Sequence, residues 1–395
     1  MREKIKVSSL LELIDDQVLS SIALATNVDY KVKKLSGSVV FKLLLMSLLD
    51  NTKISLRILE KTFSTSLFKH FSGVNKDQSI RYNSLSERLS VINPIYFEKL
   101  YHHLYQVSKQ YIATDSSPYY IGQFDSTSVS VSSKLLKHSM VNGLKNKDGE
   151  HRKSQLKFTV GLLHDLPGTI DFYNQQKYLA EDLTLRESIL KAGVENNEVV
   201  VFDRGLKKRT TFKEFNDQGL FFVTRINPTK SIKVVEENRL KTSVETQTLY
   251  LLSDEQVHLY HQKKLLFRQP FRLIKSRSKQ TEEALFFITN INDLKAEEIT
   301  RIYKKRWEIA VFFKFIKQHL HFKHLLNHSE NGIKVMMYMT MIMAILILMY
   351  KKINQIKSYK LAKYDFTEEL NMEIIKEIVL ICGGDPTKSE LFDTS

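Results

Sequence analysis

Hydrophobic residues recur every three or four positions through the first 112 residues of the chain. The segments SLLELI, VVFKLLLMSLL and FEKLYHHLYQV show this spacing, and polar breaks such as Asn93-Pro94 separate them. The spacing is typical of short amphipathic helices. We therefore predict a helical domain over residues 1–112.

One stretch of this helical region, RYNSLSERLSVINP, carries Arg81, Ser84, Ser86 and Arg88. A small helical bundle that presents serine and arginine is compatible with docking onto DNA. A helical bundle with no such role fits the same residues equally well. The sequence leaves both interpretations open.

The pattern changes near Tyr119, where β-rich and partly alternating segments begin. YYIGQFDSTSVSV, QLKFTVGLLHD and GTIDFYNQQ predict three consecutive strands, with a turn at residues 166–168. A helix follows that begins near Glu181 and Asp182, and then the order strand, helix, strand up to residue 227. This order over residues 113–227 predicts a mixed α/β sheet with helices on its faces.

Residues 228–281 contain short β-like pieces and no convincing helix, so we predict a β insertion. The span 263–279 contains no acidic residue and seven basic ones: Lys263, Lys264, Arg268, Arg272, Lys275, Arg277 and Lys279. Basic side chains on a twisted ribbon suit a phosphate backbone. The alternative is a solvated charged edge that discourages aggregation.

After the insertion, EEALFFITNI predicts a strand, and residues 295–322 predict one long amphipathic helix. We assign residues 282–330 to the second part of the α/β core and residues 331–395 to a C-terminal helical region. Residues 335–350 are apolar without a break. A membrane-spanning helix needs roughly 20 such residues. We therefore predict a buried helix and no membrane anchor.

Charge and cysteine content narrow the class of protein. Lys and Arg number 59 against 44 for Asp and Glu, which gives a formal charge of +15. A strongly basic chain favours a polyanionic partner, most simply DNA or RNA. The single cysteine, Cys382, excludes an internal disulfide and a cysteine-based zinc site, and it fits a cytoplasmic location.

Two carboxylates stand out by their place at predicted buried strands. Asp125 follows IGQF, and Asp203 follows VVVF. Each aspartate alone is compatible with a turn or cap residue. Two buried carboxylates on neighbouring strands repel each other unless a cation lies between them. Mg²⁺ and Mn²⁺ prefer such oxygen ligands, and two such ions can promote phosphodiester hydrolysis.

A third element lies in the segment IYKKRWEIAVFFKFIKQHL. Tyr303, Arg306, position 310 and Lys317 are separated by 3, 4 and 7 residues. On an α-helix these positions share one face, and Arg and Lys on such a face can hold phosphate groups. An amphipathic helix with an ordinary polar stripe has the same pattern.

Together these residues resemble the DDE transposases of bacterial insertion sequences, in particular the IS-four type group. The resemblance covers roughly residues 115–330. It depends on QFDSTSV, on VVVFDRGL and on a Tyr-x2-Arg-x3-Glu-x6-Lys signature. It implies a ribonuclease-H-like core interrupted by β-strands, with an N-terminal DNA-binding region.

The resemblance also implies roles for individual residues. Asp125 and Asp203 match the catalytic metal ligands, for two Mg²⁺ or Mn²⁺ ions, while Tyr303, Arg306 and Lys317 match residues that grip DNA. It further implies double-stranded DNA as partner and a homodimer in the DNA complex. Further candidates for DNA contact are Arg204, Lys263, Lys264, Arg268, Arg272, Lys275 and Arg277.

The chain departs from the signature at one position, where Ala310 stands in place of the catalytic glutamate. Glu308 lies about 200° around an ideal helix from that position, so we expect it to face away. We expect Trp307 to pack the helix onto the sheet. An alanine cannot bind a metal ion, which predicts impaired catalysis. An engineered Glu→Ala change and a naturally decayed copy both explain Ala310.

Three functions remain open at this point. The first is a transposase that cleaves transposon ends and joins the 3′-hydroxyl to target DNA. The second is a non-catalytic protein that binds transposon ends, such as a decayed transposase or a repressor, which Ala310 favours. The third is a metal-dependent nuclease without strand transfer. The intact Asp125 and Asp203 favour the first.

Overall fold

The computed structural model describes residues 4–50, 53–112, 119–131, 139–142, 153–193, 198–227, 232–261 and 263–388. Contacts between residues divide the chain into two compact units. The first unit comprises Met1–Ala113 and Phe313–Ser395, and the second comprises Thr114–Phe312. The division into five segments that we made from the sequence remains a prediction.

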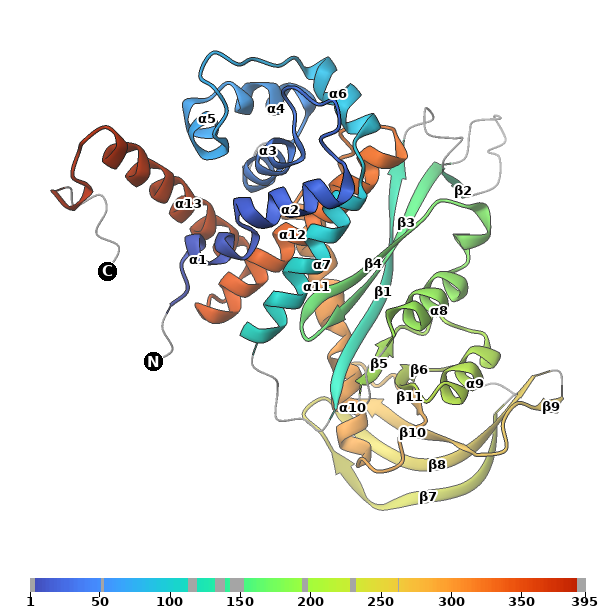
Figure 1. Cartoon of the computed structure of the whole chain (residues 1–395). Helices are drawn as coiled ribbons and strands as arrows, with labels where there is room; N and C mark the ends of the chain where they lie inside the picture. The colour runs from blue at the N-terminus through green and yellow to red at the C-terminus, as the bar shows by residue number, and fades with distance from the viewer. Residues whose placement is uncertain are drawn as a thin grey trace. The chain divides into compact units, whose positions relative to one another are not determined.

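The first unit is helical, and its central element is α12 (Glu330–Ile353), against which α3, α6, α7 and α13 pack (Figure 1). Within the described residues, α12 is the one helix long and apolar enough to cross a membrane, yet 94% of its apolar window is buried. The prediction of a buried helix over residues 335–350 is confirmed. The other helices of the unit are α1 (Val7–Leu11), α2 (Asp16–Thr26), α3 (Gly37–Leu49), α4 (Leu56–Phe63), α5 (Ser66–Ser72), α6 (Tyr82–Val91), α7 (Ile95–Ser108) and α13 (Tyr359–Ile381).

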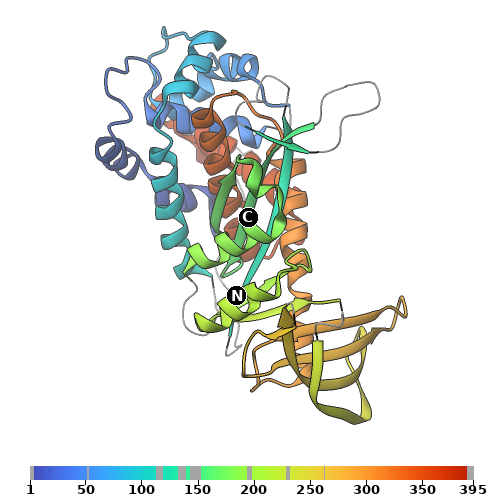
Figure 2. The same cartoon turned by 90° about the vertical axis from the view of Figure 1, so that its right-hand side faces the viewer.

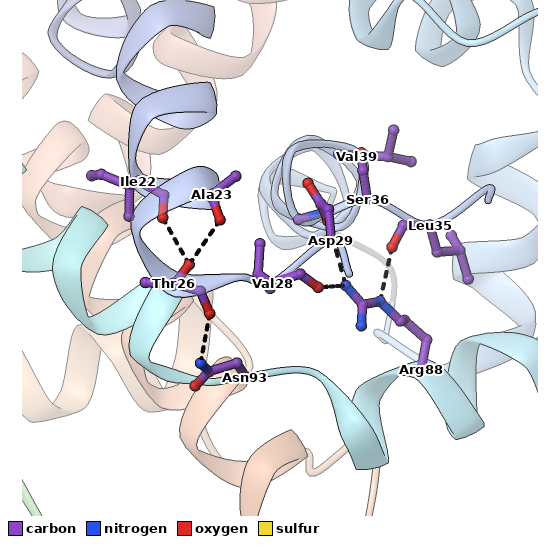
Figure 3. A network of polar contacts seen from close by, with 11 residues as sticks. Ile22, Ala23, Thr26, Val28, Asp29, Leu35, Ser36, Val39, Arg88 and Asn93 are labelled. Carbon is purple, nitrogen blue, oxygen red and sulfur yellow. Dashed lines mark hydrogen bonds and ion pairs between the residues drawn. The ribbon is translucent and has the colours of Figure 1, made fainter. Parts of the chain in front are cut away.

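Arg88 of α6 has a structural role in this unit, as Figure 3 shows. Its Nε donates to the carbonyl of Leu35 and its Nη2 to the carbonyl of Val28, both at 2.8 Å. Asp29 lies 3.6 Å from the same guanidinium. Arg88 therefore holds the connection between α2 and α3, which favours the interpretation of this segment as part of a helical bundle.

The second unit is built on one large sheet whose first half has the ribonuclease-H-like strand order β4-β3-β1-β5-β6. β3 runs antiparallel to β1 and β4, whereas β5 runs parallel to β1 and to β6. The predicted fold class is thus confirmed. These strands are β1 (Tyr120–Val131), β2 (Met140–Asn142), β3 (Lys153–Leu163), β4 (Leu166–Tyr173), β5 (Glu198–Phe202) and β6 (Phe221–Arg225), where β2 pairs with the start of β3.

The turn between β3 and β4 lies two residues earlier than expected. His164 and Asp165 both have positive φ, at 55° and 60°. Two such residues form the tight hairpin turn that matches strand twist. Pro167 lies within β4, which pairs with β3. The sequence-based placement of the turn at residues 166–168 was wrong because a Pro-Gly pair can also occupy a strand at a sheet edge.

The β insertion is present as predicted, and it continues the same sheet. β11 pairs with β6, and the order then runs β11-β10-β8-β7. In Figure 2 these strands form a curved continuation of the sheet. They are β7 (Ile232–Glu245), β8 (Leu249–His261), β9 (Lys264–Leu265), β10 (Phe271–Ser278) and β11 (Ala284–Thr289).

The two faces of the sheet are covered by different helices. α8 (Glu181–Ala192) packs on β1, β3 and β4, and α9 (Arg209–Asp217) packs on β6 and β8. Val199 and Val201 of β5 lie in a buried cluster with Ile299 and Tyr303 of α10 (Ala296–Lys304). Because side chains alternate along a strand, Asp203 shares the face of Val199 and Val201.

The helix predicted over residues 295–322 is two helices, α10 and α11 (Arg306–His319). Lys305 separates them, and its backbone N–H bonds to the carbonyl of Ile302, three residues back. Such a tightened turn interrupts the regular helical hydrogen bonds. Tyr303 and Arg306 therefore lie on different helices, and the prediction of one continuous helix was wrong.

Candidate active site

The first two predicted catalytic residues lie where the parallel pairing of β1 with β5 ends: Asp125 is within β1, and Asp203 directly follows β5. Phe124 of β1 is paired with Phe202 of β5, so Asp125 and Asp203 follow at the same level. Neighbouring strands lie about 4.8 Å apart. Asp125 Oδ1 accepts from the backbone N–H of Ser126, and Asp203 Oδ1 from that of Arg204, both at 2.7 Å.

Asp125 is in an unfavourable electrostatic position. Burial, together with the charges of Glu181 and Asp203, raises its pKa to about 6. The Ser126 N–H and the Arg306 guanidinium act in the opposite direction. A carboxyl with a strongly raised pKa beside other acids is typical of functional sites. The arrangement stores electrostatic repulsion that a bound cation would relieve.

Tyr303 supports Arg306 at this site. Its ring packs against Phe287 with centroids 5.1 Å apart, and only 8% of the residue is exposed. Burial raises the pKa of its hydroxyl to about 12, while a hydrogen bond to Arg306 lowers it. Arg306 Nε is buried and has no hydrogen-bond partner among the described residues. The structure thus gives Tyr303 a part in positioning Arg306, whose Nε can take an anionic ligand.

Position 310 lies on the same flank of α11 as Arg306. Residues four apart on a helix share a face, and Ile309, which is fully buried, faces the core beside them. Ala310 is half-buried there. The signature glutamate would therefore project from the flank that carries Arg306, but a methyl group occupies this position.

Glu308, which we expected to face away from position 310, contacts the sheet. Gln123 Nε2 of β1 donates to Glu308 Oε2 at 3.1 Å. Gln123 lies two residues before Asp125 and therefore on the same face of β1. Glu308 occupies the flank of α11 opposite to Arg306, and that flank also meets β1. Both flanks of a helix that lies along a strand can contact that strand.

Glu181 is an acidic residue of this site that we identified from the sequence only as a helix start. It begins α8, and its pKa is raised, mainly by burial and also by Asp203. Lys157 lies near enough to lower that pKa in part. The sequence does not reveal this role, because two adjacent acidic residues, Glu181 and Asp182, are common at a helix N-terminus.

Lys317 lies on α11 with Arg306 and Ala310, as the spacing predicted, whereas Trp307 does not have the role expected for it. Lys317 is in the first unit, where its ammonium lies 5.4 Å from the centroid of Phe313. Trp307 is 64% exposed, with the Arg306 guanidinium 5.2 Å from its ring centroid. Trp307 therefore does not pack the helix onto the sheet, whereas Ile309 and Phe312 of the same helix are fully buried.

The basic residues of the insertion fall into two groups. Arg272 is buried and donates to both oxygens of Asp254 at 2.8 and 2.6 Å, and Lys275 pairs with the buried Glu255 at 2.6 Å. Their assignment to DNA contact is corrected, since both are taken by acids of β8. The exposed candidates are Arg204, Lys263, Lys264, Arg268 and Arg277, of which Arg277 lies 3.6 Å from Glu282.

The donor set at the strand ends fits a hard divalent cation. Asp125 and Asp203 offer carboxylate oxygens at one level of the sheet, with the raised pKa of Asp125 marking uncompensated negative charge. Mg²⁺ and Mn²⁺ prefer such ligands. In the part of the chain that the structure describes, no three His, Cys, Asp or Glu side chains are already gathered as a metal cage. The hydrogen bonds from the Ser126 and Arg204 N–H groups to Oδ1 fix the orientation of the Asp125 and Asp203 carboxylates.

Comparisons with known proteins agree with this geometry. The family model described as "Transposase DDE domain" matches residues 116–347. A transposase of Sinorhizobium fredii is 26% identical over 41% of this chain and 45% of its own length. The transposase named for insertion sequence element IS4SA of Synechocystis is 29% identical over 57% of this chain and 58% of its own. The chain thus spans about half the length of these relatives.

One solved structure with a similar fold is a piggyBac transposase synaptic complex with hairpin DNA. It is 12% identical, with a TM-score of 0.49, over 98% of this chain and 83% of that one. The ribonuclease-H-like order of the present chain follows from its own strand pairing.

Proposed function

Because the chain belongs to the transposase DDE domain family, we propose that it binds the ends of a DNA transposon, cleaves them and transfers the 3′-hydroxyl ends to target DNA. The observation that carries this proposal is that Asp125 and Asp203 directly follow the paired residues Phe124 and Phe202 of two parallel strands, with Arg306 near Asp125. The reaction is phosphodiester hydrolysis followed by strand transfer, with water as the first nucleophile and the 3′-hydroxyl as the second.

We assign the metal-binding role to Asp125 and Asp203. Bound Mg²⁺ or Mn²⁺, two ions in the intact site, would activate the nucleophile and stabilise the leaving oxygen of the phosphodiester. Arg306 offers its buried Nε to a phosphate oxygen, and Tyr303 holds the Arg306 side chain in place. A buried guanidinium binds phosphate strongly because its hydrogen bonds are charge-assisted.

The proposed partners are double-stranded DNA, first the transposon ends and then the target. A homodimer in the DNA complex brings two ends together, and the cytoplasm of a bacterium is the proposed location. The net charge of +15 supports a polyanionic partner. The exposed Lys263, Lys264 and Arg268 of the insertion are candidates for contact with the phosphate backbone.

We further propose that Ala310 lowers the activity of this chain. The side chain at 310 lies on the flank of Arg306, and an alanine supplies no carboxylate there. The test is Ala310→Glu, assayed for cleavage of transposon-end DNA with Mg²⁺. We expect a gain in cleavage, whereas Ala310→Gln, a matched control without charge, should give none. Equal cleavage by all three proteins would contradict the assignment of position 310.

A second candidate function is supported by the same residue. A chain without the signature glutamate can serve as a non-catalytic protein that binds transposon ends. It predicts end-specific DNA binding with no cleavage in the wild type or in Ala310→Glu. Joined products in the Ala310→Glu reaction would support the transposase and exclude both this candidate and a simple nuclease.

A further inference from the structure

We propose that Glu181 supplies the third carboxylate of the catalytic site in this chain, in place of the glutamate missing at position 310. The inference rests on the proposed function, because it assigns a ligand to the metal site of that reaction. Two contacts hold the first turn of α8 beside the segments that follow Asp203 and Asp125, and a third places the Glu181 carboxylate itself against Gly205.

The first contact joins the start of α8 to the loop that follows Asp203. Asp182 Oδ1 accepts from the backbone N–H of Lys208 at 3.1 Å and also from that of Lys207. Asp182 thereby binds this loop to the first turn of α8. Its neighbour Glu181 is held beside the same loop as a consequence.

The second contact joins the same turn of α8 to β1. Thr184 Oγ1 donates to the carbonyl oxygen of Glu181 at 3.1 Å and lies 3.4 Å from Ser126 Oγ. Ser126 directly follows Asp125. The first turn of α8, which contains Glu181, is therefore linked to β1 next to Asp125 and to the loop that follows Asp203.

The third contact is a close approach to the backbone. A Cβ atom built on Gly205 would lie 2.5 Å from Glu181 Oε2 and 2.6 Å from its Cδ. The Glu181 carboxylate thus occupies the space that a side chain at position 205 would fill, two residues after Asp203. Only a glycine allows this approach, since any other residue would push the carboxylate aside.

Two other acidic side chains are weaker candidates for the third carboxylate. Glu308 accepts a hydrogen bond from Gln123 and lies on the flank of α11 opposite to Arg306. Asp182 is taken by two backbone N–H groups. Glu181 has Lys157 as its nearby cation. An ion pair with Lys157 alone would make Glu181 structural, and that role predicts no effect on metal binding.

The experiment measures Mn²⁺ binding to the full-length protein by electron paramagnetic resonance of free Mn²⁺. We expect Glu181→Gln to weaken the affinity by on the order of tenfold or more, as loss of a ligand does. Glu187→Gln, which removes the same charge from the same helix, should bind as the wild type does. Unchanged binding by Glu181→Gln would overturn the proposal.

A second variant leaves the charge in place and keeps the proposal testable if Glu181→Gln folds poorly. Gly205→Ala should displace the Glu181 carboxylate and weaken Mn²⁺ binding, with little loss of stability because a flexible side chain can move. Added to Glu181→Gln, it should have no further effect. An additional loss in the double variant would contradict displacement of Glu181 as the cause.

The controls separate this inference from the proposed function. Asp125→Asn should abolish Mn²⁺ binding in either case. If the wild type binds no Mn²⁺, the proposed metal-dependent function fails. If the wild type binds Mn²⁺, Asp125→Asn does not, and Glu181→Gln binds normally, only the role of Glu181 fails. Ala310→Glu should restore the binding that Glu181→Gln loses.

Discussion

The carboxylates Asp125, Asp203 and Glu181 and the cations of the basic insertion differ in how their charges are arranged. Burial raises the pKa of Asp125 and of Glu181, the charge of Asp203 adds to both shifts, and the charge of Glu181 adds to that of Asp125. In the insertion, Arg272 and Lys275 each meet an acid of β8 at 2.6 Å. A buried charge with a partner is part of the scaffold, whereas like charges gathered together need a ligand.

The largest effect in this comparison should come from breaking the paired charges. Arg272→Ala leaves Asp254 buried without its cation and removes donors from the carbonyls of Ile291 and Leu294. Loss of one partner of a buried pair costs about 3–5 kcal/mol of unfolding free energy. Urea denaturation measures this value. Arg268→Ala, an exposed control in the same segment, should change stability by less than about 0.5 kcal/mol.

Removal of the Asp125 charge should have a smaller effect on stability, and of opposite sign. The pKa of Asp125 is raised from 3.8 to about 6, so the folded state binds this proton more tightly than the unfolded chain does. The stability contributed by Asp125 is therefore lost as the pH rises from about 4 to 6. At pH 7 without metal, Asp125→Asn should be more stable by up to about 3 kcal/mol.

Thermal and urea unfolding in EDTA at two pH values tests this prediction. Near pH 4 the aspartate is protonated in the folded protein, so the wild type and Asp125→Asn should have similar stability. A gain of equal size at both pH values would point to packing and not to charge. Addition of Mn²⁺ should stabilise the wild type alone, because a ligand that binds only the folded state stabilises it.

Removal of the exposed cations should change stability least, but it should weaken binding to DNA. Combined Lys263→Ala, Lys264→Ala and Arg268→Ala should leave unfolding unchanged within about 0.5 kcal/mol. If all three contact phosphates, the slope of log affinity for DNA against log salt should fall by about 3. Fluorescence anisotropy with duplex DNA measures this slope. Lys275→Met should not alter it, since Lys275 is taken by Glu255.

The sequence predicted the order of strands and helices along the chain and marked Asp125 and Asp203 beside buried strands, because both depend on local pattern. Alternating and continuous apolar runs identify strands, and carboxyl ends of parallel neighbours meet at one level. The β insertion was predicted for the same reason, and residues 335–350 were correctly expected to be buried.

What the sequence did not reveal depends on contacts between distant segments. The partners of Arg272 and Lys275 lie on β8, outside the acid-free span that suggested a DNA contact. The break at Lys305 places Tyr303 and Arg306 on two different helices. The spacing of residues along the sequence does not reveal such a break. The place of Glu181 depends on Gly205 and on α8 as a whole.

The continuity of the sheet through β6 and β11 has a consequence for how this protein avoids aggregation. An open strand edge offers unpaired backbone groups to other chains. β11 covers the edge of β6, and the open edge moves outward to β7. There, Lys233 and Glu236 place exposed charges beside the exposed Val234 and Val235. The strands that interrupt the core thus also protect it, and a variant cut back to the bare core would expose an apolar edge to self-association.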